Sequence, residues 1–572
     1  MIKELQSKLK KSVHQGIECE EKRKHIVLEG VVDSYDEIIR AGYLAARDEY
    51  KGVVNRLKVD GLEDKSIRIP TLSDHQFKDD PCDVLVIGGG IIGCAIIRWL
   101  SKYNLDILLV DKESDIAMHQ SSRNDGMVHP GFAPKPGSNK AVYNVKGNQM
   151  FEKMAGDLEV PFKRVGTYML FEHYYYALIK ELFFRRAEHN NMGTIEFLFK
   201  DEILKREPFV TDKVKCGIYM PTTAVCPPYE MTVALAENAV LNGARVSLET
   251  YVYKMQKDKD KIMKVYTNRG EIIPKVVINC AGLSADFIAE LADDRFFTIH
   301  PRKGQIAILD KNKADRLDCV LSIIDLKTMK SRTKGGGLVK TVEGNIVVGP
   351  SAYEQPYKED YSTTKEDMDE LLEKNLSYIK GLSRSDVITY TAGNRAATYK
   401  EDFIIEKSDY VSNLIHIAGI QSPGYASSPA IAEKACEYAL EILKEKMKIT
   451  DNERYDPHRK SIPRLDKFPK DMRSDMIMKN RDYGHIICRC EHISKGEIID
   501  AIHSPIPAVT LDAIKRRTRG GMGRCQGGFC TPLIMEIIKE ETDLKMEEIS
   551  KKGKQSHILY QSTRVKAGRN DD

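Results

Sequence analysis

Four cysteines near the C-terminal end of the chain have a spacing that suits metal binding. Cys488 and Cys490 form a C-x-C pair, and Cys525 and Cys530 form a C-x4-C pair after a helical stretch. Four thiolates can hold either a tetrahedral zinc ion or an iron–sulfur cluster. Zinc sites commonly use pairs separated by two to four residues, and the C-x-C pair departs from this habit.

A second group of residues has the types and spacing of a dinucleotide-binding turn. Three glycines, Gly88-x-Gly90-x-x-Gly93, follow the apolar run 84–87 and lead into a helical stretch from residue 94. Glycines let the backbone approach a pyrophosphate, and the helix N-terminus offers unpaired N–H groups. A second apolar run, 107–110, ends on Asp111, whose carboxylate can bind both ribose hydroxyls. The unit therefore predicts FAD or NAD rather than NADP. The alternative is a buried unit whose glycines serve only a tight turn.

The composition is that of an ordinary soluble protein with several domains. With 572 residues, 30% of them charged and 42% hydrophobic, we expect three or four domains with ample core. We see no apolar signal segment and no apolar run of membrane length. The eight other cysteines are scattered, mostly in apolar surroundings, which indicates a reducing compartment and predicts a cytoplasmic protein.

Linkers and composition changes divide the chain into six predicted segments. In chain order they are a small α+β unit at 1–60, a polar linker at 61–80, the main domain at 81–455, a basic irregular linker at 456–485, the cysteine domain at 486–545 and a loose polar tail at 546–572.

The first sixty residues follow a short strand–helix–strand pattern. We expect strands at 25–32 and 52–59 and a helix between them that is capped at Ser34. This order resembles the BON domain, a small α+β module of bacterial envelope and stress proteins. The alternative reading is a docking or oligomerisation unit.

Several motifs of the main domain resemble the D-amino-acid-oxidase-type FAD superfamily. Besides the glycine turn they are V-I-N-C-A-G-L at 277–283, P-R-K-G-Q at 301–305, G-N-I-V-V-G-P at 344–350 and A-G-I-x-S-P-G at 418–424. Among its members the chain is most similar to glycerol-3-phosphate dehydrogenases of the anaerobic type and L-2-hydroxyglutarate oxidases, which share the style of G-M-V-H-P-G at 126–131. The resemblance implies an α/β fold, with a Rossmann-like FAD-binding domain and an antiparallel-sheet substrate domain. Beside it, the cysteine segment resembles the [2Fe–2S] domain of bacterioferritin-associated ferredoxins, so we favour a [2Fe–2S] cluster over zinc.

The resemblance also implies site residues. For FAD it carries over Gly88, Gly90, Gly93, Asp111, Lys112, Ser121, Ser122, Val252, Ala281, Gly282, Gly419 and Gly424.

Two residues match family positions that act on the substrate. His129 is expected to act as the base or as a positioning group beside the flavin, the alternative being a loop histidine bonded to backbone. Arg395, in A-G-N-R, is expected to bind the substrate's anionic group, the alternative being a structural ion pair. Relatives often have proline after this arginine, where this chain has Ala396. Lys303 and Lys334 are weaker candidates for additional positive charge.

The implied activity is oxidation of a small anionic hydroxy compound by FAD, with electrons leaving through the cluster. The first choice of substrate is sn-glycerol 3-phosphate, oxidised to dihydroxyacetone phosphate; L-2-hydroxyglutarate is second and an amino acid or opine third. The acceptor would be a flavoprotein or a quinone-linked subunit, and peripheral attachment to a membrane stays compatible with the sequence. The alternative of another class is a non-catalytic electron-relay subunit.

A basic run accompanies the second cysteine pair: Lys515, Arg516, Arg517, Arg519 and Arg524. These residues are expected to offset the cluster's charge, to steer an acidic acceptor or to form a solvated face. Nucleic acid is an improbable partner because no aromatic residues are interleaved with the run.

Overall fold

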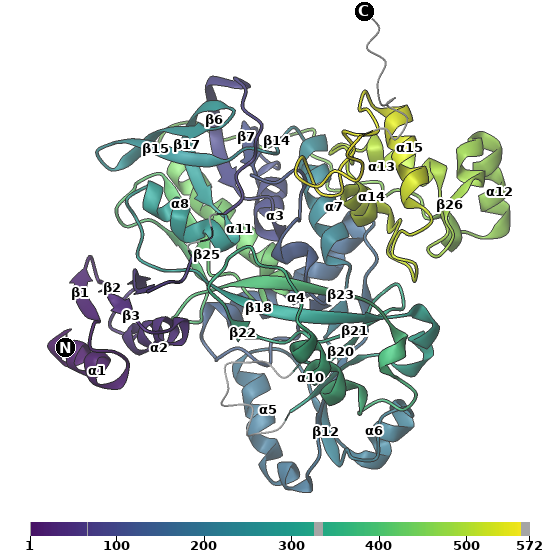
Figure 1. Ribbon diagram of the computed structural model, residues 1–572, viewed down its shortest axis with the longest axis horizontal. Coiled ribbons are helices and arrows are strands. Elements are labelled where there is room, and N and C mark those ends of the chain that lie inside the picture. Colours follow the sequence, from purple (N-terminus) through teal and green to yellow (C-terminus); the bar gives the residue numbers. More distant parts are fainter. Residues whose placement is uncertain (1, 64, 66, 325–335, 562–572) are drawn as a thin grey trace, which may run out of the picture.

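A largely parallel sheet centred on strand β6 forms the core of the main domain (Figure 1). The computed structural model describes residues 2–63, 65, 67–324 and 336–561. Strand order is β14-β7-β6-β17-β16-β15, and β25 also pairs with β17 and with β24. The bounds are β6 Phe77–Ile87, β7 Ile107–Val110, β14 Arg245–Ser247, β15 Val252–Asp258, β16 Lys261–Thr267, β17 Gly270–Asn279, β24 Ile404–Lys407 and β25 Leu414–Ala418.

Four helices pack around this sheet: α3 (Ile91–Leu100), α4 (Asn139–Asp157), α7 (Pro228–Leu241) and α11 (Gly424–Lys444). Helix α3 is buried along nearly its whole length because its side chains are apolar on all sides. The first turn of α3 needs Gly93, since a Cβ there would lie 2.0 Å from the carbonyl oxygen of Gly88 in the preceding loop.

From the sequence we expect both α3 and β6 to begin later in the chain than they do. Helix α3 begins at Ile91, before the expected residue 94, and strand β6 begins at Phe77, inside the predicted linker. The extra residues of β6 are strand because they pair with β17, starting from Phe77 opposite Gly270. A partner so distant in the chain leaves no local signal.

A second, nine-stranded sheet stands beside the first and confirms the expected substrate domain. Its pairs are antiparallel except β10–β19. Strand order is β11-β12-β10-β19-β20-β21-β18-β22, with β23 also on β18. The bounds are β10 Thr167–Phe171, β11 Glu196–Phe199, β12 Cys216–Met220, β18 His300–Leu309, β19 Val320–Ile323, β20 Leu338–Lys340, β21 Ile346–Val348, β22 Tyr353–Glu354 and β23 Val387–Ala397.

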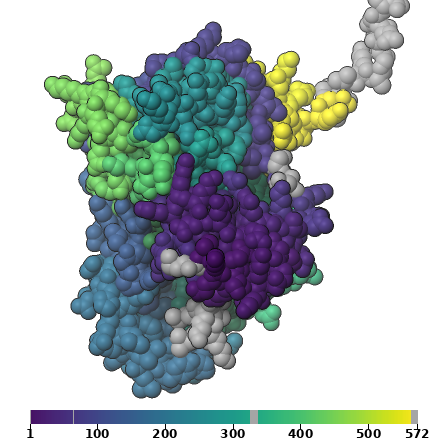
Figure 2. Space-filling view, turned by 90° about the vertical axis from the view of Figure 1, so that its left-hand side faces the viewer, coloured from purple at the N-terminus to yellow at the C-terminus, as the bar shows by residue number. Residues whose placement is uncertain are grey.

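The N-terminal unit (purple in Figure 2) lies on the surface and covers the middle of the face shown there. Its strands β1 (Glu18–Lys22), β2 (His25–Glu29) and β4 (Val53–Asn55) form a sheet, and α2 (Tyr35–Ala45) begins after Ser34, which caps it as expected. Helix α1 (Ile2–Ser12) precedes them. Tyr399 of the main domain completes the core of this unit, and its hydroxyl accepts a hydrogen bond from Asn55. The resemblance to a BON domain stays a prediction.

The C-terminal domain contains a short hairpin and three helices: β26 (Ile486–Cys488), β27 (Ile493–Ser494), α13 (Lys495–Ile502), α14 (Leu511–Thr518) and α15 (Thr531–Glu541). The predicted irregular linker before it holds helix α12 (Lys470–Lys479), none of whose residues is buried. The beginning of the predicted loose tail is ordered, because Ile549 is fully buried and Ser114 of the main domain donates a hydrogen bond to the carbonyl of Lys552.

A buried ion pair attaches the C-terminal domain to the main domain. Asp115 lies in the loop after strand β7 of the first sheet. Its carboxylate is 2.6 Å from Arg516 and 2.9 Å from Arg517, both on α14. Arg519 lies 2.8 Å from Glu491 and also donates to Tyr229 of α7. Three of the five basic residues near the cysteines are therefore buried and paired, not part of a solvated face. The charged residues in the sequence could not by themselves predict these ion pairs, because the partners are up to 402 positions apart in the chain.

We predict that Asp115→Asn weakens this attachment. The change leaves the buried Arg516 without a charge partner and Arg517 with only Glu237, 3.8 Å away, and breaking a buried pair costs about 3–5 kcal/mol. Calorimetry of the holoprotein should show the unfolding transition of the C-terminal domain at a lower temperature. Asp310→Asn is the matched control, because Asp310 pairs across the same boundary with the exposed Arg524 and exposed pairs contribute at most about 1 kcal/mol. Equal shifts in both variants would contradict the prediction.

The same pair fixes a pH dependence. Burial raises the pKa of Asp115, but the charges of Arg517 and Arg516 outweigh burial and lower the pKa from 3.8 to about 2. A folded-state pKa below the unfolded value stabilises the fold above about pH 4 and ceases to do so as pH falls toward 2. Asp115→Asn should flatten the acid side of the stability profile.

Candidate functional site

A cavity of about 260 Å³ opens where the parallel strands of the first sheet end, next to the second sheet. Its lining includes the ends of β6, β7, β17 and β25 and one face of β18 and β23. Eleven of the predicted site residues line it: Gly88, Gly90, Asp111, Lys112, Ser121, His129, Val252, Ala281, Gly282, Arg395 and Gly424. The structure thus brings together most of the residues that the sequence singled out.

Four predicted residues lie outside this lining. Gly93 packs behind the glycine turn, Ser122 donates a hydrogen bond to the carbonyl of His119, and Gly419 adopts a positive φ of 67° beside Thr398. Lys303 is buried and lies 2.8 Å from Asp360, so its charge is already neutralised. Lys334 lies outside the described residues.

The dinucleotide end of the cavity is built around Asp111. Its carboxylate accepts backbone N–H groups from Gly89 at 2.5 Å and from Glu113 at 2.8 Å, and burial raises its pKa. Ser121 accepts the N–H of Ile91 in the first turn of α3. Gly282 lines the cavity with no heavy atom within 4 Å of the place where a Cβ would stand. An acid, a helix N-terminus and bare backbone facing one cavity fit a dinucleotide.

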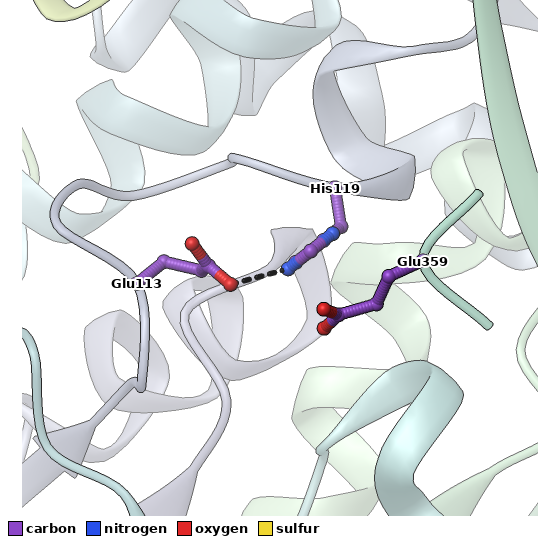
Figure 3. Close-up of side chains that lie close together, drawn as sticks. All are labelled: Glu113, His119 and Glu359. Atoms are coloured by element: carbon purple, nitrogen blue, oxygen red, sulfur yellow. Dashed lines mark hydrogen bonds and ion pairs between the residues drawn. The ribbon is translucent and has the colours of Figure 1, made fainter. Parts of the chain in front are cut away.

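An ion-pair network borders this end of the cavity, and Figure 3 shows three of its members, Glu113, His119 and Glu359. His119 lies 2.8 Å from Glu113, and Lys112 lies 2.7 Å from Glu113 and 2.6 Å from Glu359. Burial, then the charge of Lys112, lowers the pKa of His119 to about 4, so its ring is neutral near pH 7. Arg68 also contacts Glu113. Because two cations already balance the two carboxylates, we interpret the group as a structural network that ties residues 112–119 to Glu359.

Arg395 carries the positive charge at the other end. It lies on β23 directly opposite Arg302 of β18, and its Nη2 donates to the carbonyl of Ser351 at 3.1 Å. Its Nη1 is buried without a hydrogen-bond partner in the described part of the chain, where it also has no carboxylate at ion-pair distance. Burial, then the charge of Arg302, lowers its pKa to about 10, so it stays protonated. The predicted alternative of a structural ion pair finds no support here.

His129 reaches the cavity from the loop between β8 (Met127–Val128) and α4. Its carbonyl accepts hydrogen bonds from Asn144 and Asn148 of α4, which orders the loop. Its ring Nε2 lies 3.2 Å from the hydroxyl of Ser422, in the turn before α11. The ring therefore contacts a side chain that lines the same cavity, while the backbone bonds involve its carbonyl.

A network behind Arg395 escaped sequence reasoning. Arg302 contacts Glu401, lies 2.9 Å from Glu354 and donates to Gln421, the neighbour of Ser422. Tyr43 of the N-terminal unit donates to Glu401 at 2.5 Å and accepts from Arg302 at 2.5 Å. Burial raises the pKa of Glu401, but Arg302 outweighs burial and lowers it to about 2. The charge of Arg302 is thus fully neutralised, whereas that of Arg395 is not.

The four cysteines meet as two pairs. The sulfur of Cys490 lies 3.6 Å from that of Cys525, and a hydrogen bond from Cys530 lowers the pKa of Cys488 to about 6. In the described residues no three cysteine sulfurs lie within 4.8 Å of one another, whereas bonds of about 2.3 Å would hold all four sulfurs of a tetrahedral zinc site within about 4 Å. Backbone N–H groups face the sulfurs, from Glu491, Gly521, Gly527, Gly528 and Phe529. The arrangement fits a cluster with two irons better than zinc.

Two family models match the chain. The model for FAD dependent oxidoreductases matches residues 83–438, and that for BFD-like [2Fe–2S] binding domains matches residues 486–540. No described helix combines the length and apolarity needed to cross a bilayer.

Three individual proteins show the range of similarity. A glycerol 3-phosphate dehydrogenase of Caloramator mitchellensis is 39% identical over 84% of this chain and 99% of its own. An L-2-hydroxyglutarate dehydrogenase of Indibacter alkaliphilus is 24% identical over 62% of this chain and 98% of its own. The solved L-alpha-glycerophosphate oxidase of Mycoplasma pneumoniae with FAD bound is 26% identical, with a TM-score of 0.61 over 66% of this chain and 98% of that one.

Family, fold and cysteine geometry agree, and the chain belongs to the FAD-dependent oxidoreductases of this family, with FAD and a C-terminal [2Fe–2S] cluster as its cofactors.

Proposed function

We propose that this enzyme oxidises sn-glycerol 3-phosphate to dihydroxyacetone phosphate. The observation that carries the proposal is Arg395, a half-buried side chain that lines the cavity and whose buried Nη1 has no hydrogen-bond partner in the described part of the chain. A planar guanidinium binds phosphate through two parallel hydrogen bonds. The similarity to a glycerol 3-phosphate dehydrogenase over nearly the whole of that protein favours phosphate over carboxylate.

The residues of the cavity divide the work of an alcohol oxidation. FAD, which we place in this cavity, supplies the acceptor for the hydride that leaves the substrate carbon. Arg395 holds the phosphate and so orients the carbon. His129 takes the hydroxyl proton at Nε2, where Ser422 now lies. The C–H hydride and the O–H proton leave the alcohol together, and a ketone remains.

The acceptor of the electrons is a protein or a quinone-linked subunit that contacts the edge of the cluster domain. Cys490 is exposed, and Phe529, next to Cys530, is 83% exposed. A large apolar side chain so exposed beside a one-electron centre favours contact with a partner. None of the twelve cysteines, all within the described residues, forms a disulfide, which supports a cytoplasmic location.

Substrate-driven reduction of the flavin tests the proposal. We expect sn-glycerol 3-phosphate to bleach the flavin absorbance of anaerobic wild-type protein promptly, and L-2-hydroxyglutarate to do so poorly. Arg395→Ala should slow bleaching by about 10²–10³-fold, since removing a buried charge-assisted contact costs about 3–4 kcal/mol of transition-state stabilisation. Arg384→Ala is the matched control and should have little effect, because Arg384 pairs with Asp369 at the surface.

Other outcomes reassign the enzyme. Bleaching by L-2-hydroxyglutarate alone would assign Arg395 to a carboxylate, and the substrate to a 2-hydroxy acid. A flavin that neither compound reduces would leave an amine substrate or the electron-relay role.

We predict that Cys525→Ser separates the two halves of the reaction. Cys525 is a cluster ligand in our proposal and lies outside the lining of the first cavity. The variant should keep substrate-driven bleaching of the flavin but lose electron transfer to an artificial one-electron acceptor. Cys436→Ser is the control, because this buried cysteine belongs to the main core. Undiminished onward transfer in Cys525→Ser would refute the electron path.

We predict a positioning role for Tyr43. Tyr43→Phe removes the hydroxyl that bonds Glu401 and Arg302, and such hydrogen bonds to charged groups contribute about 1.5–3 kcal/mol. We expect kcat to fall about tenfold while the KM for substrate changes little, since Arg395 is retained. Arg56→Ala is the control, because Arg56 joins the same unit to Glu290 through an exposed pair. Parallel losses in both variants would indicate a merely structural role.

A further inference from the structure

A second cavity, of about 380 Å³, lies where the main domain, the substrate sheet and the C-terminal domain meet. Its walls come from strands β18 and β23, residues 225–229, the segment 341–347, helix α14 and residues 551 and 552. Met522 and Gln526, in the loop that carries Cys525, also line it. The cavity therefore touches the parts of the molecule that hold both redox centres.

The second cavity continues the first along the same sheet. Gly304 of β18 and Gly393 of β23 line the first cavity, and Ile306 and Thr391, two residues along each strand, line the second. The segment 123–125 lies between the two cavities and contributes to both linings. It is held there by Arg123, whose Nη1 donates to the carbonyl of Ala392.

Positive charge gathers at one side of this cavity. Arg123, Lys515, Lys551 and Lys552 all line it, and none of them has an ion pair in the part of the chain that the structure describes. Asp512 is the carboxylate that offsets them most directly. Burial lowers the pKa of Lys515. Their neighbour Arg516 differs, because Asp115 neutralises it.

This charge distribution favours the binding of an anionic ligand. Glu343, in the same lining, pairs with Arg519, so among the described residues four unpaired cations face two unpaired carboxylates, Asp125 and Asp512. A local surplus of positive charge remains, and like charges held close together repel one another. Paired arginines at the same boundary show that the fold neutralises cations where it needs them only for docking. A surplus left beside a cavity is an anion-binding arrangement.

The wall that the substrate sheet contributes is partly apolar, although β23 adds Thr389, Tyr390 and Thr391 to it. Ile306, Ile308 and Val347 come from the substrate sheet, and Val225 and Met522 come from the loops beside it. A small inorganic anion would leave this wall in contact with water. The combination suits a molecule with an anionic head and an apolar body.

We propose that the second cavity binds an organic phosphate, with its phosphate among Lys515, Lys551 and Lys552 and its apolar body against Ile306 and Ile308 of β18. A phosphate monoester carries close to two negative charges near neutral pH, which matches the surplus better than a single carboxylate does. Lysine binds phosphate as a point charge without a fixed geometry. The site is distinct from the Arg395 end of the first cavity and rests on this geometry, not on the proposed substrate.

Two sources share this chemistry. The ligand is either the phosphate-bearing substrate or product in transit to the first cavity, or a second organic phosphate with a larger body. The first source is favoured because the segment 123–125 lines both cavities, which are therefore adjacent. The second source is favoured by the apolar side chains of the wall.

Calorimetric titration of the oxidised holoenzyme with phenyl phosphate tests the site, because this probe has a phosphate and an apolar ring but no oxidisable carbinol. We expect wild type and Arg395→Lys to bind it alike. The double variant Lys551→Ala, Lys552→Ala should bind at least tenfold more weakly, and so should Lys515→Met. Lys551 and Lys552 are exposed, so the double variant should fold normally. Lys554→Ala, an exposed lysine of the same loop outside the cavity, is the control.

Three results would overturn the proposal: no binding by wild type, equal affinity in the lysine variants, or loss of binding only in Arg395→Lys. Kinetics then distinguish the sources. Competition between phenyl phosphate and sn-glycerol 3-phosphate, with a KM raised several-fold in the lysine variants, identifies the substrate route. Binding of phenyl phosphate that leaves this KM unchanged identifies a second ligand. Either source supports the site, and both binding tests stand even if the proposed substrate is wrong.

Discussion

A half-buried guanidinium without an ion-pair partner among the described residues is the constraint around which the substrate end of the cavity is arranged. Arg395 stands directly opposite Arg302 on the neighbouring strand, so two positive charges share one face of a sheet, and Arg302 is buried there. The arrangement is tolerable only if one of the charges is cancelled. Glu354 and Glu401 cancel Arg302, and Tyr43 holds Glu401 in place. Arg395 is then left as the charge that a substrate anion can neutralise.

Through Tyr43, the N-terminal unit helps to hold this arrangement of charges in place. The hydroxyl of Tyr43 and the side-chain amide of Gln421 both bond the carboxylate of Glu401. Gln421 precedes Ser422, whose hydroxyl lies beside the ring of His129. The unit also shares its core with Tyr399 of the main domain. A module whose hydrophobic core includes a residue of its neighbour is expected to move with it, so its effect on the site is a steady positioning rather than a gate.

Local patterns foretold the parts of the site that are local in the chain. The glycine turn, Asp111 and the cysteine pairs each lie within a few dozen residues, and their chemistry follows from spacing. Residues whose role depends on a remote partner could not be read in this way. Lys303 resembles a substrate ligand until Asp360 is seen beside it, and Arg516 resembles a surface charge until Asp115 is seen. Strand pairing across nearly two hundred residues likewise extended β6 beyond its apolar run.

Pairing, more than charge itself, sorts the cations of this protein by role. Arg302, Arg516 and Arg519 are buried with carboxylate partners and hold parts of the structure together. Arg395 and the lysines of the second cavity face hollow space and have no ion pair among the described residues. The cations that join the domains are fully paired with carboxylates, so carboxylates could have been placed beside the other cations as well. The cations it leaves unsatisfied beside cavities are therefore the ones to associate with ligands, and both such places adjoin the path from substrate to cluster.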